Sequence, residues 1–381
     1  MTDMIYLDNA ATTKISDSVL EAMLPFLKES YGNAGSSHSF GREAATALEE
    51  ARRICARCLI CKPRELFFTS GGSESNNWAI KSAVKTQAQK GKRHIITTAF
   101  EHHSVLNVIR ELEENGFEVT YLPVYGNGIV RISDFEKALR SDTALVTVML
   151  ANNEIGTLQP VGKIGAICRE KGVLLHTDAV AAVGNIAVDL EKLNVDLLSL
   201  TAHKFHGPKG VGLLYCRDGI GIAPFIHGGG QEKGRRAGTE NVAGAVGLAK
   251  AFDEATKGLA QKQKRLLPLR DRLIAEMKKI RGAHLNGDRA SRLCNNVSFS
   301  FEGIDGEALV LQLDLQGIAV SSGSACTSGA LEPSHVLLAL GQPAELAKGS
   351  LRITMSKLTD EREVERLLAV LPQVMERLRK A

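Results

Sequence analysis

The stretch Leu197-Leu-Ser-Leu-Thr-Ala-His-Lys-Phe-His-Gly-Pro-Lys-Gly210 combines a predicted strand with a candidate reactive residue at its end. It opens with an apolar run, residues 197–201, whose length and composition predict a buried strand. A single lysine, Lys204, follows that strand and precedes a Gly-Pro turn. In α/β proteins, binding and reacting groups gather where parallel strands end. A lysine in this position suits the formation of an imine with an aldehyde.

Similar apolar runs recur on both sides of this stretch and alternate with helical patterns. Strands are predicted at residues 65–69, 94–98, 118–122, 145–150, 173–177 and 211–215. Helical patterns stand between them at residues 73–85, 104–115 and 161–171. Such alternation predicts an α/β fold with a mostly parallel central sheet and helices on both of its faces.

The pattern changes after about residue 240. A long helical and basic stretch is predicted over residues 243–281, and strands are predicted at 296–301 and 350–354. Further helices are predicted at residues 306–315 and 359–380. We expect this part to form a smaller α+β domain that the long helix joins to the first domain.

The composition is that of an ordinary globular protein. Of 381 residues, 44% are hydrophobic and 24% are charged, and the formal net charge is only +4. This balance predicts no direct binding of nucleic acid and no membrane partner, and no apolar window approaches the ~20 residues of a membrane span. The most basic run, Lys233-Gly-Arg-Arg236, is open to two readings, a solvated loop or part of a site. Seven cysteines, mostly in apolar segments, predict reduced thiols and a cytoplasmic location.

Three polar clusters follow predicted strands. Thr69-Ser-Gly-Gly-Ser-Glu-Ser-Asn76 joins a strand to a helix, where glycines and free N–H groups favour a phosphate site, although a helix cap looks similar. Asp178 is either a helix cap or a carboxylate that keeps a pyridine nitrogen protonated. In Glu101-His-His103, one imidazole could stack on a ring and move protons, and the sequence leaves open which one.

Two other motifs suggest chemistry that the sequence does not support. His227-Gly-Gly-Gly230 is typical of an esterase oxyanion loop, but the chain lacks the Gly-x-Ser-x-Gly elbow that a serine hydrolase needs. Cys55, Cys58 and Cys61 have cluster-like spacing without the fourth cysteine. Cys55 and Cys58 also share one helical face with apolar residues, so buried packing is the favoured interpretation and no metal site is predicted.

A second reactive group is predicted near the end of the chain. Ser321-Ser-Gly-Ser-Ala-Cys-Thr-Ser-Gly329 places Cys326 among small polar residues, which suits a cysteine nucleophile that must travel. Imine-forming lysine and nucleophilic cysteine are separate covalent chemistries. Few enzymes need both.

Together these motifs resemble one family over essentially the whole chain, the cysteine desulfurases (NifS/IscS-like), which are pyridoxal-phosphate enzymes of fold type I. The loop around Cys326 resembles the subgroup with a long cysteine loop. The resemblance rests on eight segments: Tyr6-Leu-Asp-Asn-Ala-Ala-Thr-Thr13, Phe68-Thr-Ser-Gly-Gly-Ser-Glu-Ser75, Asn152-Asn-Glu-Ile-Gly156, Thr201-Ala-His-Lys204, His227-Gly-Gly-Gly230, Gly238-Thr239, Ser321-Ser-Gly-Ser-Ala-Cys-Thr327 and Leu351-Arg-Ile-Thr354.

The resemblance implies a role for each matching residue. Lys204 is implied as the Schiff-base lysine and as the acid and base for the substrate Cα proton. Asp178 is implied to pair with the pyridine nitrogen of pyridoxal 5'-phosphate, and His102 to stack on its ring. Cys326 is implied to receive the sulfur as a persulfide. The implied binding residues are Gly72, Ser73, Thr201 and His203 for the phosphate, Thr239 for the same phosphate from a neighbouring subunit, and Asn153 and Arg352 for the substrate carboxylate.

One position departs from the family. A glutamine usually stands three residues after the aspartate and donates to the phenolic oxygen of the cofactor, but Ala181 occupies that place here. Loss of such a bond is worth about 0.5–1.5 kcal/mol. We therefore expect a shifted pKa of the cofactor imine and slower turnover rather than abolition of the reaction.

The resemblance implies a homodimer that converts L-cysteine to L-alanine and passes sulfur to an acceptor protein such as an iron–sulfur cluster scaffold. It implies a large cofactor-binding domain at residues 16–255 and a small domain at residues 1–15 and 256–381, with the cysteine loop at about 321–333. Alternatives are a selenocysteine lyase or another pyridoxal-phosphate enzyme, a sulfur donor for tRNA or DNA thiolation, and a weakly active or inactive scaffold favoured by Ala181.

Overall fold

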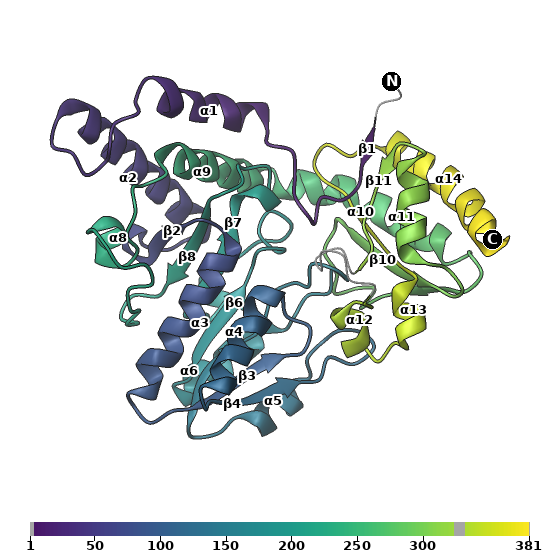
Figure 1. Cartoon of the computed structure of the whole chain (residues 1–381), viewed down its shortest axis with the longest axis horizontal. Coiled ribbons are helices and arrows are strands. Elements are labelled where there is room, and N and C mark those ends of the chain that lie inside the picture. Colours follow the sequence, from purple (N-terminus) through teal and green to yellow (C-terminus); the bar gives the residue numbers. More distant parts are fainter. Residues whose placement is uncertain (1–3, 324–331, 381) are drawn as a thin grey trace.

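The computed structural model describes residues 4–323 and 332–380, and its largest element is a seven-stranded sheet (Figure 1). The strand order is β2-β8-β7-β6-β5-β3-β4. The strands from β7 to β4 run parallel, whereas β8 is antiparallel to both of its neighbours. The mostly parallel sheet is therefore confirmed. Its strands are β2 (Leu66–Thr69), β3 (His94–Thr98), β4 (Glu118–Leu122), β5 (Thr143–Thr147), β6 (Leu174–Asp178), β7 (Leu197–Thr201) and β8 (Gly212–Cys216).

Both faces of this sheet are covered by helices, as the continuous apolar strands require. Successive strand residues point to opposite faces. Leu197 accordingly joins a core cluster with Trp78 of α3, whereas Leu198 joins the cluster that contains Phe252 of α9. The helices on the first face are α3 (Gly72–Ala88) and α4 (His103–Glu114), and those contributing to the second cluster are α2 (Ser39–Leu59), α5 (Ile132–Ala138), α6 (Val161–Lys171) and α9 (Val242–Lys257).

A second, smaller unit is built around an antiparallel sheet with a core cluster of its own. In that sheet β10 (Asn296–Phe301) lies between β9 (Ala283–Leu285) and β12 (Ser350–Thr354). The start of the chain belongs with this unit, because β1 (Ile5–Tyr6) pairs with β11 (Ile318–Ala319) and Leu7 is buried in its core. The helices that contribute to this core are α10 (Leu259–Met277), α11 (Gly306–Asp314) and α14 (Glu361–Lys380). The two short helices α12 (His335–Ala339) and α13 (Ala344–Lys348) bury side chains in the core cluster of the large sheet instead.

The single long helix expected over residues 243–281 is wrong. The structure has two helices, α9 and α10, which meet at Gly258. Glycine has one of the lowest helix propensities, so the helix is interrupted at the residue where continuing it is least favourable. α9 packs in the core of the large sheet and α10 in the core of the small unit. The domain division expected at residues 255/256 lies within the last turn of α9, three residues before this junction, and we propose that the two units divide at Gly258, with residues 1–15 assigned to the small unit.

Shorter elements complete the fold. They are α1 (Asp17–Lys28), α7 (Leu190–Leu193), α8 (Gln231–Gly234) and the 3-10 turns η1 (Pro63–Glu65) and η2 (Ala202–Lys204). Among the described residues, no helix combines the length and apolar character needed to cross a bilayer.

Candidate active site

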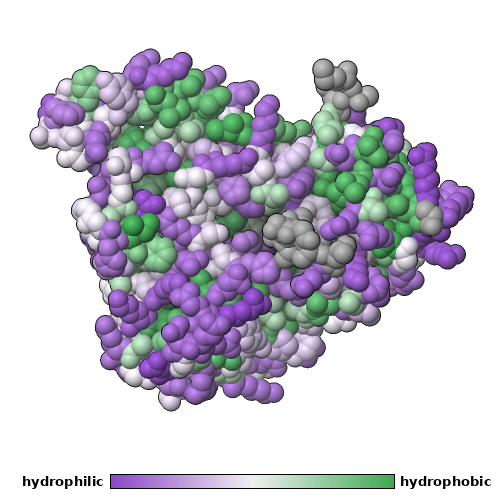
Figure 2. Space-filling model, viewed as in Figure 1, coloured by the Kyte–Doolittle hydropathy of each residue, from purple (hydrophilic) through white to green (hydrophobic). Residues whose placement is uncertain are grey.

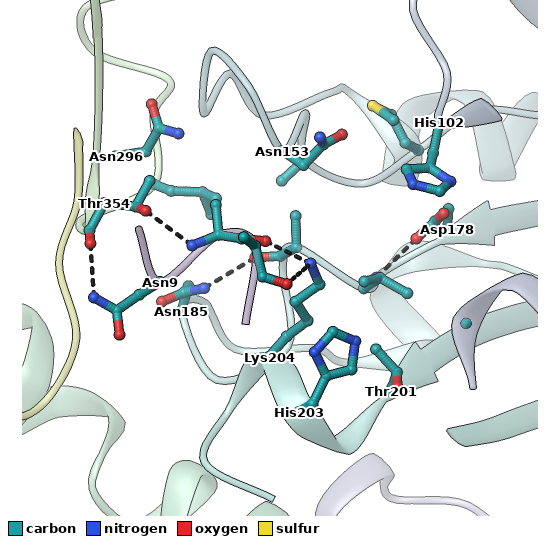
Figure 3. A pocket seen from close by; sticks show the side chains of 18 of the residues that line it. Asn9, His102, Asn153, Asp178, Asn185, Thr201, His203, Lys204, Asn296 and Thr354 are labelled. Atoms are coloured by element: carbon teal, nitrogen blue, oxygen red, sulfur yellow. Dashed lines mark hydrogen bonds between the residues drawn. The ribbon is translucent and has the colours of Figure 1, made fainter. Parts of the chain in front are cut away.

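A cavity of about 330 Å³ lies at the carboxyl ends of β6 and β7 (Figure 3). Its remaining walls come from the N-terminal segment and from the small unit. Most of the residues expected at a site come together here. Thr239 does not line the cavity and is exposed, and Cys326 lies outside the described residues. The expected residues that line the cavity are Gly72, Ser73, His102, Asn153, Asp178, Thr201, His203, Lys204 and Arg352.

Lys204 is held at the centre of the cavity by the segment that crosses it from the N-terminus. β7 leads into the tight turn η2, so the lysine leaves the sheet within three residues of the strand end. Its Nζ donates to the backbone carbonyls of Ala10 and Ala11, the latter at 2.8 Å. The segment is itself fixed, because the backbone N–H of Thr13 donates to the carbonyl of His203. The amine is thereby directed into the cavity.

Asp178 lies at the end of β6, and its two carboxylate oxygens have different partners, one in the following turn and one at the cavity. Its Oδ1 accepts from the backbone N–H of Val180 (2.9 Å), as a turn cap does. Its Oδ2 accepts from Nδ2 of Asn76 at 2.7 Å, on the cavity side. Asn76 is nearly inaccessible, and its Oδ1 has no hydrogen-bond partner among the described residues. No sequence motif marks Asn76 as a site residue, and the available signal is its position one helical turn after Gly72 at the same sheet edge.

The structure distinguishes the two histidines that the sequence left open. His102 lines the cavity, whereas His103 turns to His335, with 4.5 Å between their ring centres. Nδ1 of His102 accepts from the backbone N–H of Ser104 and pairs with its hydroxyl at 2.8 Å. Burial lowers the pKa of His102 below its usual value, and nearby Lys204 lowers it further. The hydroxyl of Ser104 also accepts from Asn76, so one polar chain connects His102 to Asp178.

The predicted phosphate cradle lies where α3 begins at the cavity wall. A Cβ placed on Gly72 would come within 2.7 Å of Cγ2 of Val180, so a side chain there would clash. Gly72 and Ser73 line the cavity at this point, and the first turn of a helix has backbone N–H groups without intrahelical partners, which suits a phosphate. His203 stays neutral nearby, because burial lowers its pKa to about 4. From the basic run, Arg236 is occupied by an ion pair with Glu74 in the first turn of α3 (2.8 Å).

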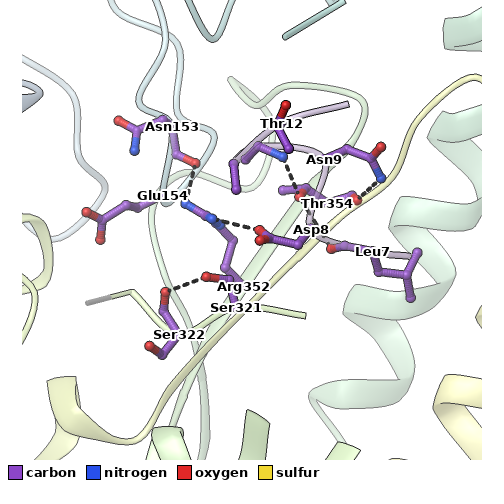
Figure 4. Close-up of polar contacts among 12 residues, drawn as sticks. Leu7, Asp8, Asn9, Thr12, Asn153, Glu154, Ser321, Ser322, Arg352 and Thr354 are labelled. Atoms are coloured by element: carbon purple, nitrogen blue, oxygen red, sulfur yellow. Dashed lines mark hydrogen bonds and ion pairs between the residues drawn. The ribbon is translucent and has the colours of Figure 1, made fainter. Parts of the chain in front are cut away.

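Arg352 approaches the cavity from β12 and is almost completely buried (Figure 4). Its Nη2 lies 2.8 Å from Oδ1 of Asp8, and its Nη1 donates to the carbonyl of Asn153 at 3.5 Å. A buried guanidinium requires such partners. Its Nε has no hydrogen-bond partner in the part of the chain that the structure describes. The role of Asp8 was not predictable from the sequence, because it depends on a contact across nearly the whole chain.

Ala181 lines the cavity where the family usually has glutamine, and it brings no polar group there. Asn185, one turn later, lines the same cavity and donates from Nδ2 to the carbonyl of Ala181 (2.9 Å). Its Oδ1 accepts from Nζ of Lys262 at 2.6 Å. Burial lowers the pKa of Lys262 to about 8. The amide of Asn185 is therefore held in one orientation beside Ala181, the position at which this chain differs from the family.

Three cysteines with cluster-like spacing lie away from this cavity. Cys55 is fully buried in α2, and Cys58 and Cys61 pack half-buried against the same core. Burial raises the pKa of all three thiols, to about 12 for Cys61. They are protonated at neutral pH and are weak nucleophiles. In residues 4–323 and 332–380, no group of three or more His, Cys, Asp or Glu is arranged to hold a metal.

The donor set of the cavity fits pyridoxal 5'-phosphate. The cavity presents an amine, Lys204, for the aldehyde and a buried carboxylate, Asp178, for the ring nitrogen. The start of α3 supplies a cradle that a Cβ at Gly72 would obstruct. Arg352 adds a cation at the opposite wall, which suits a substrate carboxylate.

Comparison with known proteins gives consistent results. The family model described as aminotransferase class-V matches residues 5–367. A protein of Dictyoglomus turgidum named cysteine desulfurase IscS is 52% identical over 376 residues, which cover 98% of this chain and 95% of that protein. One of the same name from Methanosarcina thermophila is 50% identical over 98% of this chain and 93% of its own. A solved structure titled NifS-like protein superposes with a TM-score of 0.92 at 43% identity, covering 98% of this chain and 99% of that one.

Proposed function

The chain belongs to the aminotransferase class-V family of pyridoxal-phosphate enzymes and is a cysteine desulfurase, and from this premise we propose how its own residues act. The substrate is L-cysteine and the products are L-alanine and a persulfide. The observation that carries the proposal is that Lys204, Asp178 and Arg352, which come from three different strands or strand ends, face one cavity. Those three groups are the ones that binding an amino acid beside an aldehyde cofactor requires.

When bound, pyridoxal 5'-phosphate supplies an aldehyde that links to amines and a ring that withdraws electrons from the substrate Cα. We assign its retention to Lys204, Asp178, the start of α3 at Gly72 and Ser73, and the pair Thr201 and His203. Asn76 fixes the carboxylate of Asp178, so that its negative charge stays directed at the cavity.

The protein residues position the substrate and move its protons. Arg352 and Asn153 bind the carboxylate of L-cysteine, for which a planar guanidinium is well shaped. Lys204 removes the Cα proton and later returns one. Burial lowers the pKa of His102 and so favours the neutral imidazole, which can accept a proton, and this side chain would stack on the ring of the bound cofactor.

Cys326, which lies outside the described residues, is the proposed sulfur acceptor. Its thiolate attacks the sulfur of the substrate, so an S–S bond forms while the substrate Cβ–S bond breaks. The electron pair of that bond stays on the carbon side, and Cβ takes up a proton. The balance is L-cysteine plus a Cys326 thiol giving L-alanine plus a Cys326 persulfide, and no external oxidant is needed. An acceptor protein, such as an iron–sulfur cluster scaffold, then removes the outer sulfur.

We further propose a homodimer in which Thr239 completes the phosphate site of the partner. Thr239 is exposed and lies away from the cavity of its own chain, as that role requires. Exposed apolar side chains along α1 and just after it support a partner surface, and they gather on one face of the molecule (Figure 2). We also propose a cytoplasmic location, supported by six free cysteines among the described residues. A direct nucleic-acid partner is not part of the proposal.

Alanine release tests the function. The cofactor-loaded protein is incubated with L-cysteine and a thiol reductant, with Cys326→Ala in parallel. Release of alanine by the wild type alone supports transfer through Cys326, and equal release by both proteins would refute that route. A scaffold without activity would release no alanine from L-cysteine, and a selenocysteine lyase would respond only to the selenium analogue.

A further inference from the structure

Two residues that flank the segment containing Cys326 lie side by side in the fold. Gly323 precedes this segment and Ser334 follows it. The backbone N–H of Gly323 donates to Oγ of Ser350 at 3.0 Å. A Cβ placed on Gly323 would lie 3.2 Å from Cβ of Ser334 and 3.3 Å from Oε2 of Glu154. The flanking residues are thus packed together at one point, and Glu154 stands at that point.

Glu154 is a buried carboxylate that the proposed mechanism has not used. Its Oε2 accepts from the hydroxyl of Ser334 at 2.5 Å. The same hydroxyl accepts from the backbone N–H groups of Val336 and Leu337, so Ser334 also caps α12. Burial raises the pKa of Glu154 to about 7, while Ser334 and Arg352 oppose that rise. Burying a carboxyl group costs free energy unless hydrogen bonds replace those to water, and the Ser334 hydroxyl supplies one such bond here.

Glu154 is joined just as closely to the proposed carboxylate subsite. It follows Asn153, whose carbonyl accepts from Arg352. Its backbone N–H donates to Oδ1 of Asn152 at 2.8 Å, which fixes the turn that carries both residues. On the other flank, Ser321 and Arg352 exchange backbone hydrogen bonds. Figure 4 shows Asn153, Glu154, Ser321 and Arg352 around this junction.

We propose that Glu154 is a positioning residue. It holds Ser334 by a hydrogen bond and packs beside Gly323, and so fixes the two flanks of the Cys326 segment relative to Arg352. The inference rests on the proposed function, because Arg352 binds the substrate there and Cys326 accepts its sulfur. Glu154 is not among the residues that line the cavity in which the substrate and the Cys326 thiol would react. Its effect is therefore on the step in which the two meet, and not on the binding of cofactor or substrate.

A double-mutant cycle tests this inference. Glu154→Ala and Ser334→Ala each remove one side of the same hydrogen bond, and Glu154→Gln keeps an acceptor for the hydroxyl. Glu65→Gln is the matched control. Glu65 is likewise a buried glutamate, its carboxylate accepts from two backbone N–H groups, and it does not line the cavity. Each protein is loaded with cofactor and mixed with L-cysteine. Persulfide on Cys326 is followed in a single turnover by alkylation and mass measurement, together with kcat and KM for alanine release and the absorption band of bound cofactor.

The expected result is a tenfold or greater fall in the rate of persulfide formation and in kcat for both alanine variants. KM and the intensity of the cofactor absorption band stay within threefold of their wild-type values. The double variant is no slower than the slower of the two single variants, and Glu154→Gln recovers most of the wild-type rate. Unchanged persulfide formation in Glu154→Ala, strictly multiplicative effects, or a parallel loss of cofactor would overturn the inference. Absence of alanine release from the wild type would instead overturn the proposed function on which it rests.

Discussion

The guanidinium of Arg352 and the carboxylate of Asp8 form an ion pair with 2.8 Å between Nη2 and Oδ1, although 344 positions separate them in sequence. The side chain of Arg352 is 3% exposed and that of Asp8 is 19% exposed. The N-terminal segment that restrains Lys204 through Ala10 and Ala11 therefore also supplies the counter-ion of the proposed carboxylate subsite. A substrate carboxylate meets an arginine whose orientation is already set.

Arg352→Lys is expected to lower kcat/KM for L-cysteine by about 10- to 100-fold, because a point charge replaces a planar fork and charged hydrogen bonds are worth about 1.5–3 kcal/mol. The loss should appear mainly in KM. Asp8→Asn keeps the guanidinium and is expected to change kcat/KM less than tenfold. Alanine release at varied L-cysteine measures both variants, and a larger defect in Asp8→Asn than in Arg352→Lys would contradict this assignment.

Asn76→Ala removes the 2.7 Å hydrogen bond to Asp178 and opens the polar chain to His102. We expect kcat to fall by roughly tenfold, since one hydrogen bond to a charged group is lost while the carboxylate itself remains. Asp178→Asn removes the charge and is expected to reduce kcat much further. The measurement is kcat at saturating L-cysteine with cofactor content determined for each protein. Equal activity of Asn76→Ala and the wild type would show that Asp178 does not need this partner.

Ala181→Gln restores the residue that the family usually carries at this wall of the cavity. The added amide is expected to raise kcat by up to about tenfold, in line with about 0.5–1.5 kcal/mol for one hydrogen bond. The position of the cofactor absorption band as a function of pH provides a second readout. An unchanged kcat with full cofactor content would mean that Asn185, already fixed by Lys262, makes the glutamine redundant, and a lower kcat would mean that the cavity no longer accommodates the glutamine side chain.

His176 links fold stability to pH. It is fully buried in β6 and pairs with hydroxyls of Thr147 and Ser199, and burial lowers its pKa from 6.5 to about 3. Below pH 6.5 the unfolded chain therefore binds a proton on this imidazole that the folded protein excludes. The contribution of neutral His176 to the free energy of unfolding is fully present above pH 6.5 and is lost as the pH falls toward 3. Between pH 7.5 and 5.5 the loss from this group is about 1.4 kcal/mol.

Urea unfolding of the wild type and of His176→Gln at those two pH values measures the His176 contribution. The variant is expected to be less stable at pH 7.5 but to lose about 1.4 kcal/mol less on acidification. Identical pH dependence in the two proteins would show that another group accounts for the acid sensitivity.

Local sequence pattern determined much of this protein by itself. The strands at 94–98, 118–122, 197–201, 296–301 and 350–354 and the helix at 161–171 coincide with their predicted bounds. Buried strands and amphipathic helices are recognisable because their periods of 2 and 3.6 residues are written in adjacent side chains. The polar clusters at strand ends were predictable for the same reason, since parallel strands bring their carboxyl ends to one edge.

Only the tertiary structure decided the contacts that join distant segments. It selected His102 over His103 for the cavity, brought Asp8 to Arg352 and Asn76 to Asp178, and placed Glu154 between Gly323 and Ser334. It also divided the expected long helix at Gly258, because α9 and α10 pack into different cores. Such pairings depend on how segments far apart in the chain pack against each other, and local propensity carries no information about a partner that lies a hundred or more residues away.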